Sequence, residues 1–344
     1  MRIGIVTVYE STTNLGSYLQ AYALKKSLEN MGHEVFMVQN VPTMKSAKEC
    51  ALKLNPKRQI FLRLKRTGHF ISDVKKLNLL YKDDIPNANL DCLIYGSDEI
   101  WNLDNPYFCN ELFYGGHVEN ITRIAYAVSA GAVSDTTIDN HPEFGANIQK
   151  YEKIMVRDER THRLVKDLTG YECEYVCDPT ILLPLEYMKK AVRRPRDKYI
   201  AVYTYGVDQP VIDIIQAFAR KKNLKVVSVF FWHPWADQVV ECSPLQFSEV
   251  LAGAEYVFTT TFHGAIFTLL NHKKCCILPL REKVKDVVER LHQDEHLIES
   301  ECTKEMFFEV MERPFDSEKF EIRVKEFRST SLQKLEGALK CLEK

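Results

Sequence analysis

The sequence lacks several features that would place it at once in a broad class. No window approaches the roughly 18 uninterrupted apolar residues of a membrane-spanning helix, and the opening run MRIGIVTVY is too short for a secretory signal and is interrupted by Glu10. The formal net charge of −1 gives no overall reason to bind nucleic acid. We therefore expect a cytoplasmic globular protein without a nucleic-acid partner.

Short motifs of common enzyme classes are also missing. There is no GxGxxG, Walker loop, GxSxG or HExxH, which argues against dinucleotide redox chemistry, P-loop phosphoryl transfer and serine hydrolysis. The ten cysteines are dispersed, with no CxxC pair and no zinc-ribbon spacing. His292 and His296 are four residues apart on an expected helix, but we interpret them as two exposed polar residues rather than metal ligands. The sequence predicts no metal and no cofactor.

What the sequence does contain is a regular alternation of strand and helix. Apolar β-rich runs and helically spaced apolar residues open the chain as a βαβ unit, which implies a parallel sheet. A polar stretch with two prolines near 184–198 separates a second alternation from the first. In the first half strands are expected in 3–9, 34–40, 90–102, 121–131 and from 153, with a helix over 14–31. In the second half strands are expected over 199–206, 225–231, 255–261 and 275–280, alternating with helices 209–222, 244–252, 264–271 and 283–292.

The fold class predicted from this pattern is α/β, with two doubly wound Rossmann-like domains facing a cleft. At 344 residues the chain exceeds the usual size of one hydrophobic core. We expect an N-terminal domain over 1–184 and a C-terminal domain over 185–312. Residues 313–344 are expected to form a helix, from Ser317, that packs back on the N-terminal domain.

Residues 45–82 form a basic segment within the first domain. Eleven Lys or Arg residues stand against two acids, Glu49 and Asp73, with apolar residues threaded between them. This composition predicts one or two basic amphipathic helices. Two interpretations stay open: a solvated helical face, or a surface that contacts anionic lipid or a pyrophosphate-bearing acceptor at the inner face of the plasma membrane.

The stretch TTTFHGAIFTLL, residues 259–270, joins the end of an expected strand to an apolar helix. His263 would lie beside the helix N-terminus, whose partial positive charge and N–H groups suit a phosphate or carboxylate. Gly264 would remove a side chain that blocks the approach. A neutral imidazole can donate or accept a proton near pH 7; a histidine bonded within the structure is the alternative.

Six motifs in order resemble the polysaccharide pyruvyl transferase family, from residue 1 to about 295. They are NLGSYLQAYALKKSLENMGHEV, YGSDEIWN, AYAVSAG, VRDERT, CDPTILL and TTTFHGAIFTLL. The resemblance implies a fold like the GT-B glycosyltransferases. It also implies an enzyme that transfers pyruvate from phosphoenolpyruvate onto a sugar of a bacterial capsule or exopolysaccharide precursor, commonly as a ketal.

The resemblance carries roles onto individual residues. His263 matches the family's general acid/base. Arg157 matches the arginine of its V-R-[DE] motif, a planar clamp for carboxylate or phosphate. The acceptor side would be lined by the matches to the Asn-x-Gly and Gly-Ser-Asp-x-x-Trp motifs, which are Asn14, Gly16, Ser97, Asp98 and Trp101. Trp101 would stack on a sugar or belong to the core.

The donor side departs from the family pattern at two places. Many members carry arginine where this chain has Thr261, and the helix over 283–292 often begins with arginine, where the basic residues here are Arg281 and Lys283. These residues, together with Gly264, complete the expected donor site.

Two other functions remain open. One is a glycosyltransferase of the same architecture that uses a nucleotide sugar, and the other is a non-catalytic saccharide-binding relative. The acceptor is expected to be a sugar, and a polyprenyl-pyrophosphate-linked saccharide if segment 45–82 contacts membranes.

Overall fold

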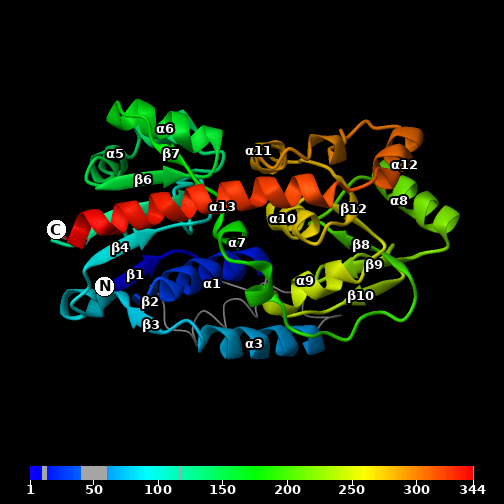
Figure 1. Ribbon diagram of the computed structural model, residues 1–344, viewed down its shortest axis with the longest axis horizontal. Helices are drawn as coiled ribbons and strands as arrows, with labels where there is room; N and C mark the ends of the chain where they lie inside the picture. The colour runs from blue at the N-terminus through cyan, green and yellow to red at the C-terminus, as the bar shows by residue number, and fades with distance from the viewer. Residues whose placement is uncertain (10–13, 40–59, 117, 119, 344) are drawn as a thin grey trace. The chain divides into compact units, whose positions relative to one another are not determined.

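The computed structural model describes residues 1–9, 14–39, 60–116, 118 and 120–343. The chain divides into two compact units, the first made of Met1–Leu183 and Phe327–Lys344 and the second of Pro184–Glu326. The boundary expected after residue 184 lies beside this division. The two units are described in turn (Figure 1).

The first unit contains a seven-stranded sheet in the order β3-β2-β1-β4-β5-β6-β7. Its strand pairings are parallel. The chain thus runs from β1 to one edge and, after β3, returns to the other side of β1, which makes the β1–β4 junction the topological switch point. The strands are β1 (Arg2–Val6), β2 (Glu34–Gln39), β3 (Leu79–Tyr81), β4 (Cys92–Tyr95), β5 (Thr122–Val128), β6 (Lys153–Val156) and β7 (Glu174–Tyr175).

Helices cover the first sheet, which explains the apolar character of its central strand β4. All four residues of β4, Cys-Leu-Ile-Tyr, are buried, as expected for a parallel strand covered on both faces. Helix α1 packs against β2 and α7, while α5 and α6 contribute Phe144, Ile148, Leu164 and Val165 to a core shared with β4. The helices are α1 (Leu15–Asn30), α3 (Ile60–Val74), α4 (Asp135–Asp139), α5 (Pro142–Ile148), α6 (Glu159–Thr169) and α7 (Pro179–Leu182), with 3₁₀ turns η1 (Lys82–Asn87) and η2 (Glu111–Tyr114).

The basic segment is partly described. Helix α3 occupies its second half, in line with the expected amphipathic helix, and β3 follows. Phe70 and Val74 are buried against neighbouring apolar residues, while Lys65 and Lys75 are exposed. Residues 45–59 of the segment lie outside the described residues, so its lipid contact stays a prediction.

The second unit contains a five-stranded parallel sheet in the order β10-β9-β8-β11-β12. Its switch point is the β8–β11 junction, by the same reasoning as in the first unit. Four strands fall where the sequence predicts them, and the short β10 was not anticipated. The strands are β8 (Tyr199–Tyr203), β9 (Lys225–Val229), β10 (Gln238–Val240), β11 (Tyr256–Thr259) and β12 (Lys274–Ile277).

The helices of the second unit begin and end at residues suited to those positions. Pro244 opens α9, and α8 ends at Asn223 in the left-handed conformation with φ 52°, which asparagine tolerates. Phe218 of α8 and Phe307 of α12 pack in one core with Phe258 of β11. The elements are α8 (Gln209–Lys222), α9 (Pro244–Ala252), α10 (Phe262–Leu270), α11 (Glu282–Arg290) and α12 (Lys304–Glu312), with 3₁₀ turns η3 (Leu185–Met188) and η4 (Asp294–His296).

The closing helix α13 (Ser317–Lys340) belongs to both units, and η5 (Cys341–Glu343) follows it. Within the first unit, Ser331 accepts a bond from the Cys177 N–H at 2.9 Å, and Arg328 Nε donates to the Ile181 carbonyl at 2.8 Å. Lys334 Nζ donates to the Tyr175 carbonyl at 2.9 Å. Residues 317–326 of α13 belong to the second unit. The helix therefore does not pack on the first unit alone, where the sequence placed it.

His296 corrects one expectation. It is fully buried, with its ring stacked on Phe315 at 5.6 Å between centroids, whereas His292 is exposed. Apolar packing, which the local sequence does not reveal, covers His296. Across the described ranges, no cluster of three potential metal ligands occurs and no helix is both long and apolar enough to cross a membrane.

Candidate active site at the strand ends

The switch point of the five-stranded sheet is lined with threonine hydroxyls. Thr204 follows β8, and Thr259 to Thr261 end and follow β11. The Oγ1 atoms of Thr204 and Thr260 lie 2.7 Å apart, and Thr259 Oγ1 donates to the Tyr203 carbonyl at 2.7 Å. The hydroxyls therefore tie the two neighbouring strand ends together at the edge where open α/β sheets bind ligands.

Thr261 caps the helix that follows. Its Oγ1 accepts a hydrogen bond from the Gly264 N–H at 3.0 Å, and α10 begins at Phe262. A neutral hydroxyl thus satisfies one of the N–H groups that a helix start leaves without an intrahelical partner. The residue at which the sequence departs from the pattern of the resembled family thus serves here as a helix cap.

His263 lies in the first turn of α10, not before the helix as the sequence suggested. Its residue is 7% exposed, and its ring meets that of Phe262 edge-on at 5.2 Å. The imidazole therefore stands at a helix N-terminus beside the threonine-lined strand ends. A group at this place can exchange a proton with a ligand bound at the sheet edge.

Gly264 is required by the protein's own threonines. A Cβ at this position would clash with the Oγ1 atoms of Thr259 and Thr261, and would come within 2.8 Å of the Tyr203 ring. The sequence argument explained this glycine by the approach of a ligand. The structure supplies a different reason, which is the close packing of the strand end on the helix start.

The two predicted donor-side cations lie at the start of α11. Arg281 is the exposed N-cap residue of this helix, and Lys283 lies in its first turn. Lys283 Nζ stands 5.4 Å from the centroid of the Phe262 ring, the residue before His263. A cation over an aromatic face is favourable, and here it places a positive charge beside the first turn of α10.

In the first unit, the switch point is organised by Gln20 of α1. Gln20 Nε2 donates to Thr7 Oγ1 at 3.2 Å and to the Val8 carbonyl at 2.6 Å, and its Oε1 accepts from Ser97 Oγ at 2.8 Å. Thr7 Oγ1 in turn donates to the Ser97 carbonyl at 2.9 Å. The predicted acceptor residue Ser97 is thereby held between the ends of β1 and β4.

Asn14 and Gly16 form the start of α1. The Asn14 side chain accepts a bond from the Gly16 N–H at 2.9 Å, so the polar residue is a helix cap. In the first turn of the helix, Ser17 Oγ donates to Asp98 Oδ2 at 3.3 Å. Through Ser17, the helix start that contains the Asn-x-Gly motif is bonded to the Gly-Ser-Asp turn. The sequence predicted that both motifs line the acceptor side.

Arg157 lies in a buried ion-paired cluster at the end of β6. Its side chain is 1% exposed, with Nη1 2.6 Å from Asp178 Oδ2 and Nη2 3.4 Å from Asp98 Oδ1. Burial alone would lower the pKa of the guanidinium, but attraction to Asp178 and Asp98 outweighs it and raises that pKa. The arginine predicted to clamp the donor therefore already holds two carboxylates.

Comparison with known proteins identifies the family. The sequence matches the family model of polysaccharide pyruvyl transferase over residues 14–280. The chain belongs to this family. A search of curated proteins gave no match.

Solved structures confirm the fold class predicted for this pyruvyl transferase family member. Spinosyn forosaminyltransferase SpnP matches with a TM-score of 0.51 at 13% identity, over 100% of both chains. UDP-GlcNAc 2-epimerase from Methanocaldococcus jannaschii matches with 0.56 at 12% identity, over 95% of this chain and 99% of that one. A putative UDP-N-acetylglucosamine 2-epimerase from Listeria monocytogenes matches with 0.58 at 9% identity, over 99% and 96%. At such identities the likeness shows the shared fold, that of GT-B glycosyltransferases and epimerases.

Trp101 of this family member is a core residue, which corrects its prediction as a sugar-stacking side chain. It is 0% exposed, and its ring meets Phe144 at 5.9 Å and Tyr151 at 5.6 Å, both edge-on. An indole packed in this way presents no face to a ligand. The other predicted site residues lie at or beside the carboxyl edges of the two sheets, and their catalytic and binding roles stay predictions.

Several residues of these edges were not singled out from the sequence. Asp178 lies in the CDPTILL motif, yet its pairing with Arg157 depends on the return of the chain to β7. Thr204 and His233 follow β8 and β9, and His233 Nε2 donates to the Thr204 carbonyl at 3.1 Å. Their position after strands was the available signal, because polar residues after parallel strands gather at one edge.

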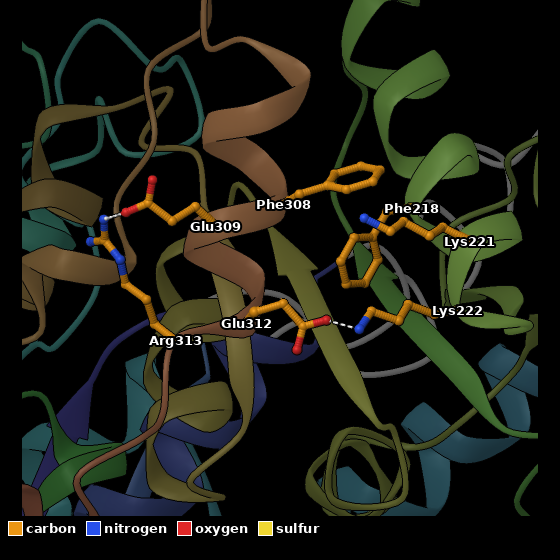
Figure 2. A pocket seen from close by; sticks show the side chains of 7 residues that line it. All are labelled: Phe218, Lys221, Lys222, Phe308, Glu309, Glu312 and Arg313. Atoms are coloured by element: carbon orange, nitrogen blue, oxygen red, sulfur yellow. Dashed lines mark hydrogen bonds and ion pairs between the residues drawn. The ribbon is translucent and has the colours of Figure 1, made fainter.

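A separate pocket of about 390 Å³ lies at the opposite edge of the second unit. Figure 2 shows Phe218 and Phe308 at its centre and the ion pairs Lys222–Glu312 and Arg313–Glu309 at its sides. Tyr256 and Lys274, the first residues of β11 and β12, contact Glu312 at 3.2 Å and 3.6 Å. The pocket is therefore at the amino ends of the strands, away from His263.

Proposed function

We propose that this transferase moves pyruvate from phosphoenolpyruvate onto a sugar of a bacterial surface polysaccharide precursor, forming a ketal on a lipid-linked saccharide. The observation that carries the proposal is the place of His263. In a chain of the pyruvyl transferase family, this histidine lies in the first turn of α10 at the switch point of the second sheet.

The start of α10 supports the donor assignment by its electrostatics. A helix N-terminus favours anionic groups. Lys283 places a full positive charge beside the same turn, and Arg281 lies two residues before it. In our proposal these groups receive the phosphate and carboxylate of the donor and take the part of the arginine that Thr261 replaces. Arg157 stays a predicted donor ligand.

The proposed reaction moves one proton to carbon and releases one phosphate. Protonation of the methylene carbon of phosphoenolpyruvate makes C2 electrophilic, and an acceptor hydroxyl adds to C2 while losing its proton. The C2–O bond to phosphate then breaks, and a second hydroxyl of the sugar closes the ketal and loses its proton. Of the two hydroxyl protons released, one makes up for the proton given to carbon and the other leaves with the phosphate. His263 shuttles a proton in this sequence, and fixed cations stabilise the charge that develops on the leaving phosphate.

The test is incubation with phosphoenolpyruvate and a panel of polyprenyl-pyrophosphate-linked saccharides, with phosphate release and product mass both followed. We expect phosphate release and a product heavier than the acceptor by a pyruvate ketal. A product formed from a nucleotide sugar and none from phosphoenolpyruvate would instead establish a glycosyltransferase. Acceptor binding without turnover of either donor would establish a saccharide-binding relative.

A further inference from the structure

Exposed aromatic side chains gather on the loops that follow β8 and β9 in the second unit. Tyr205 is 63% exposed and Trp232 is 45% exposed, unusual values for large rings. Phe231, which directly precedes Trp232 in the chain, has its ring 4.8 Å from that of Tyr205. We call Tyr205, Phe231 and Trp232 the aromatic platform.

The platform is held in place by the strand ends beneath it. Phe231 contacts the buried ring of Tyr203, the last residue of β8, at 5.2 Å between centroids. Ser228 Oγ donates to the Phe231 carbonyl at 2.6 Å, which fixes the turn after β9. The Phe231 ring, fixed in this way, supports the ring of Tyr205 and so reduces the conformational entropy that Tyr205 loses when a ligand binds.

The platform adjoins the threonine-lined switch point. Tyr205 directly follows Thr204, whose Oγ1 lies 2.7 Å from that of Thr260. His233, which follows Trp232, donates through Nε2 to the Thr204 carbonyl at 3.1 Å. A ligand on the platform would therefore lie beside the edge at which we place the reaction.

Charge decides which class of ligand fits. Loops 203–209 and 230–238 contain no Lys or Arg, and their charged residues are Asp208 and Asp237. Burial lowers the pKa of His233, so its imidazole is neutral near pH 7. These loops offer no cation to phosphoenolpyruvate or to a nucleotide phosphate. Exposed aromatic faces on loops without cations instead suit a neutral sugar, whose C–H face stacks on the rings while its hydroxyls form hydrogen bonds.

We infer that the aromatic platform binds a neutral pyranose ring of the acceptor saccharide by stacking on Tyr205 and Trp232. Its position in the reaction rests on the proposed function, but binding of a saccharide to the platform does not. The inference assigns a saccharide contact to the second unit, where the sequence placed only donor ligands.

The direct test is NMR of the tryptophan indole N–H signals of the whole protein. The chain has three tryptophans, and single Trp→Phe variants assign Trp101, Trp232 and Trp235. Lactose, maltose and N,N′-diacetylchitobiose serve as neutral probes, each titrated to tens of millimolar. We expect at least one of them to shift the Trp232 signal saturably and to leave Trp101, which is buried, unmoved.

Phosphoenolpyruvate and uridine monophosphate are titrated in parallel. We expect neither to shift the Trp232 signal as a saccharide does. If none of the three disaccharides shifts Trp232 saturably, or if only the nucleotide does, the inference is overturned. This result is separate from the proposed reaction, because failure of phosphate release would leave the saccharide titration intact.

Variants locate the contact. Tyr205→Ala should weaken disaccharide binding about tenfold, the usual scale for removing an aromatic anchor, while Tyr205→Phe should retain most of it. Tyr187→Ala is the matched control, because Tyr187 is 46% exposed in the same unit. In turnover, Tyr205→Ala should raise KM for the saccharide about tenfold and leave KM for phosphoenolpyruvate within about twofold. Equal weakening by Tyr187→Ala would contradict the assignment.

Discussion

The switch points of the two sheets share a strand order and differ in chemistry. In the first unit, the buried Arg157 at the end of β6 pairs with Asp98, which follows β4 at the switch point, and with Asp178, the N-cap of α7. In the second, threonine hydroxyls and a histidine line the corresponding edge. The same parallel topology thus supports a locked ionic cluster in one unit and a neutral, hydroxyl-lined edge in the other.

The difference separates charge that stabilises the fold from charge that is available to a ligand. Asp98 and Asp178 both contact Arg157, so much of the positive charge of Arg157 is already paired within the protein. At the second edge, the cation Lys283 lies in the first turn of a helix beside Phe262 and His263. Substitution of Arg157 should therefore act mainly on stability, and substitution of His263 or Lys283 mainly on turnover.

The largest expected effect is that of Arg157→Met on stability. Removing the cation leaves Asp178 and Asp98 buried without their partner, which should cost about 3–5 kcal/mol in the free energy of unfolding. Trp101 reports the first unit in a Trp232→Phe/Trp235→Phe background, so urea unfolding followed by its fluorescence measures the loss.

Arg160→Met is the control for this prediction. Arg160 pairs with Asp135 at 2.6 Å, but its side chain is 32% exposed and that of Asp135 is 83% exposed. A solvent-exposed pair contributes about 0–1 kcal/mol. An Arg157→Met protein as stable as Arg160→Met, with only KM for phosphoenolpyruvate raised, would mean that Arg157 serves the donor rather than the fold.

His263→Ala should give the largest effect on turnover. Loss of an acid/base group costs at least about 100-fold in kcat, and the fold should persist because the cap of α10 comes from Thr261. Phosphate release from phosphoenolpyruvate measures the rate, and the control is His292→Ala, because His292 is an exposed histidine that follows α11. A His263→Ala rate within about threefold of the parent would remove this residue from the chemistry.

The sequence anticipated the elements better than it anticipated the contacts between them. Helices 209–222 and 244–252 were predicted to the residue, because proline and asparagine mark their ends. Trp101 and His296 were misplaced because their burial depends on Phe144, Tyr151 and Phe315, which are distant in the chain. The partners of Arg157 were hidden for the same reason, since only the strand order β4-β5-β6-β7 brings Asp98 and Asp178 to it.

Gly264→Ala tests whether this glycine serves packing. The added methyl group meets the hydroxyls of Thr259 and Thr261, and overpacking of this kind costs about 2 kcal/mol. Unfolding of a Trp101→Phe background, in which Trp232 and Trp235 report the second unit, measures it. Gly206→Ala at the same edge has open space around the added carbon and should change stability by less than about 0.5 kcal/mol. Equal stability of the two variants would argue against the packing role.

Lys283→Met tests whether this cation receives the donor. Loss of one charged contact should raise KM for phosphoenolpyruvate about tenfold, with little change in stability. Lys285→Met is the control, because Lys285 is exposed on the same helix and lies 3.7 Å from Glu289. If both variants have the parent's KM, the donor's charge is met elsewhere.

The smallest effect is expected at Thr261, where the comparison between the two edges is sharpest. Thr261→Val keeps the shape of the side chain but removes the hydroxyl that accepts from the Gly264 N–H, so it should lose about 1 kcal/mol of stability. Thr261→Ser keeps the cap and should lie within about 0.5 kcal/mol of the parent. Urea unfolding in the Trp101→Phe background resolves the pair. If the Thr261→Val and Thr261→Ser proteins are equally stable, the Thr261 hydroxyl is not needed as a helix cap. The hydroxyl would then be available to a substrate, like the other threonine hydroxyls of this edge.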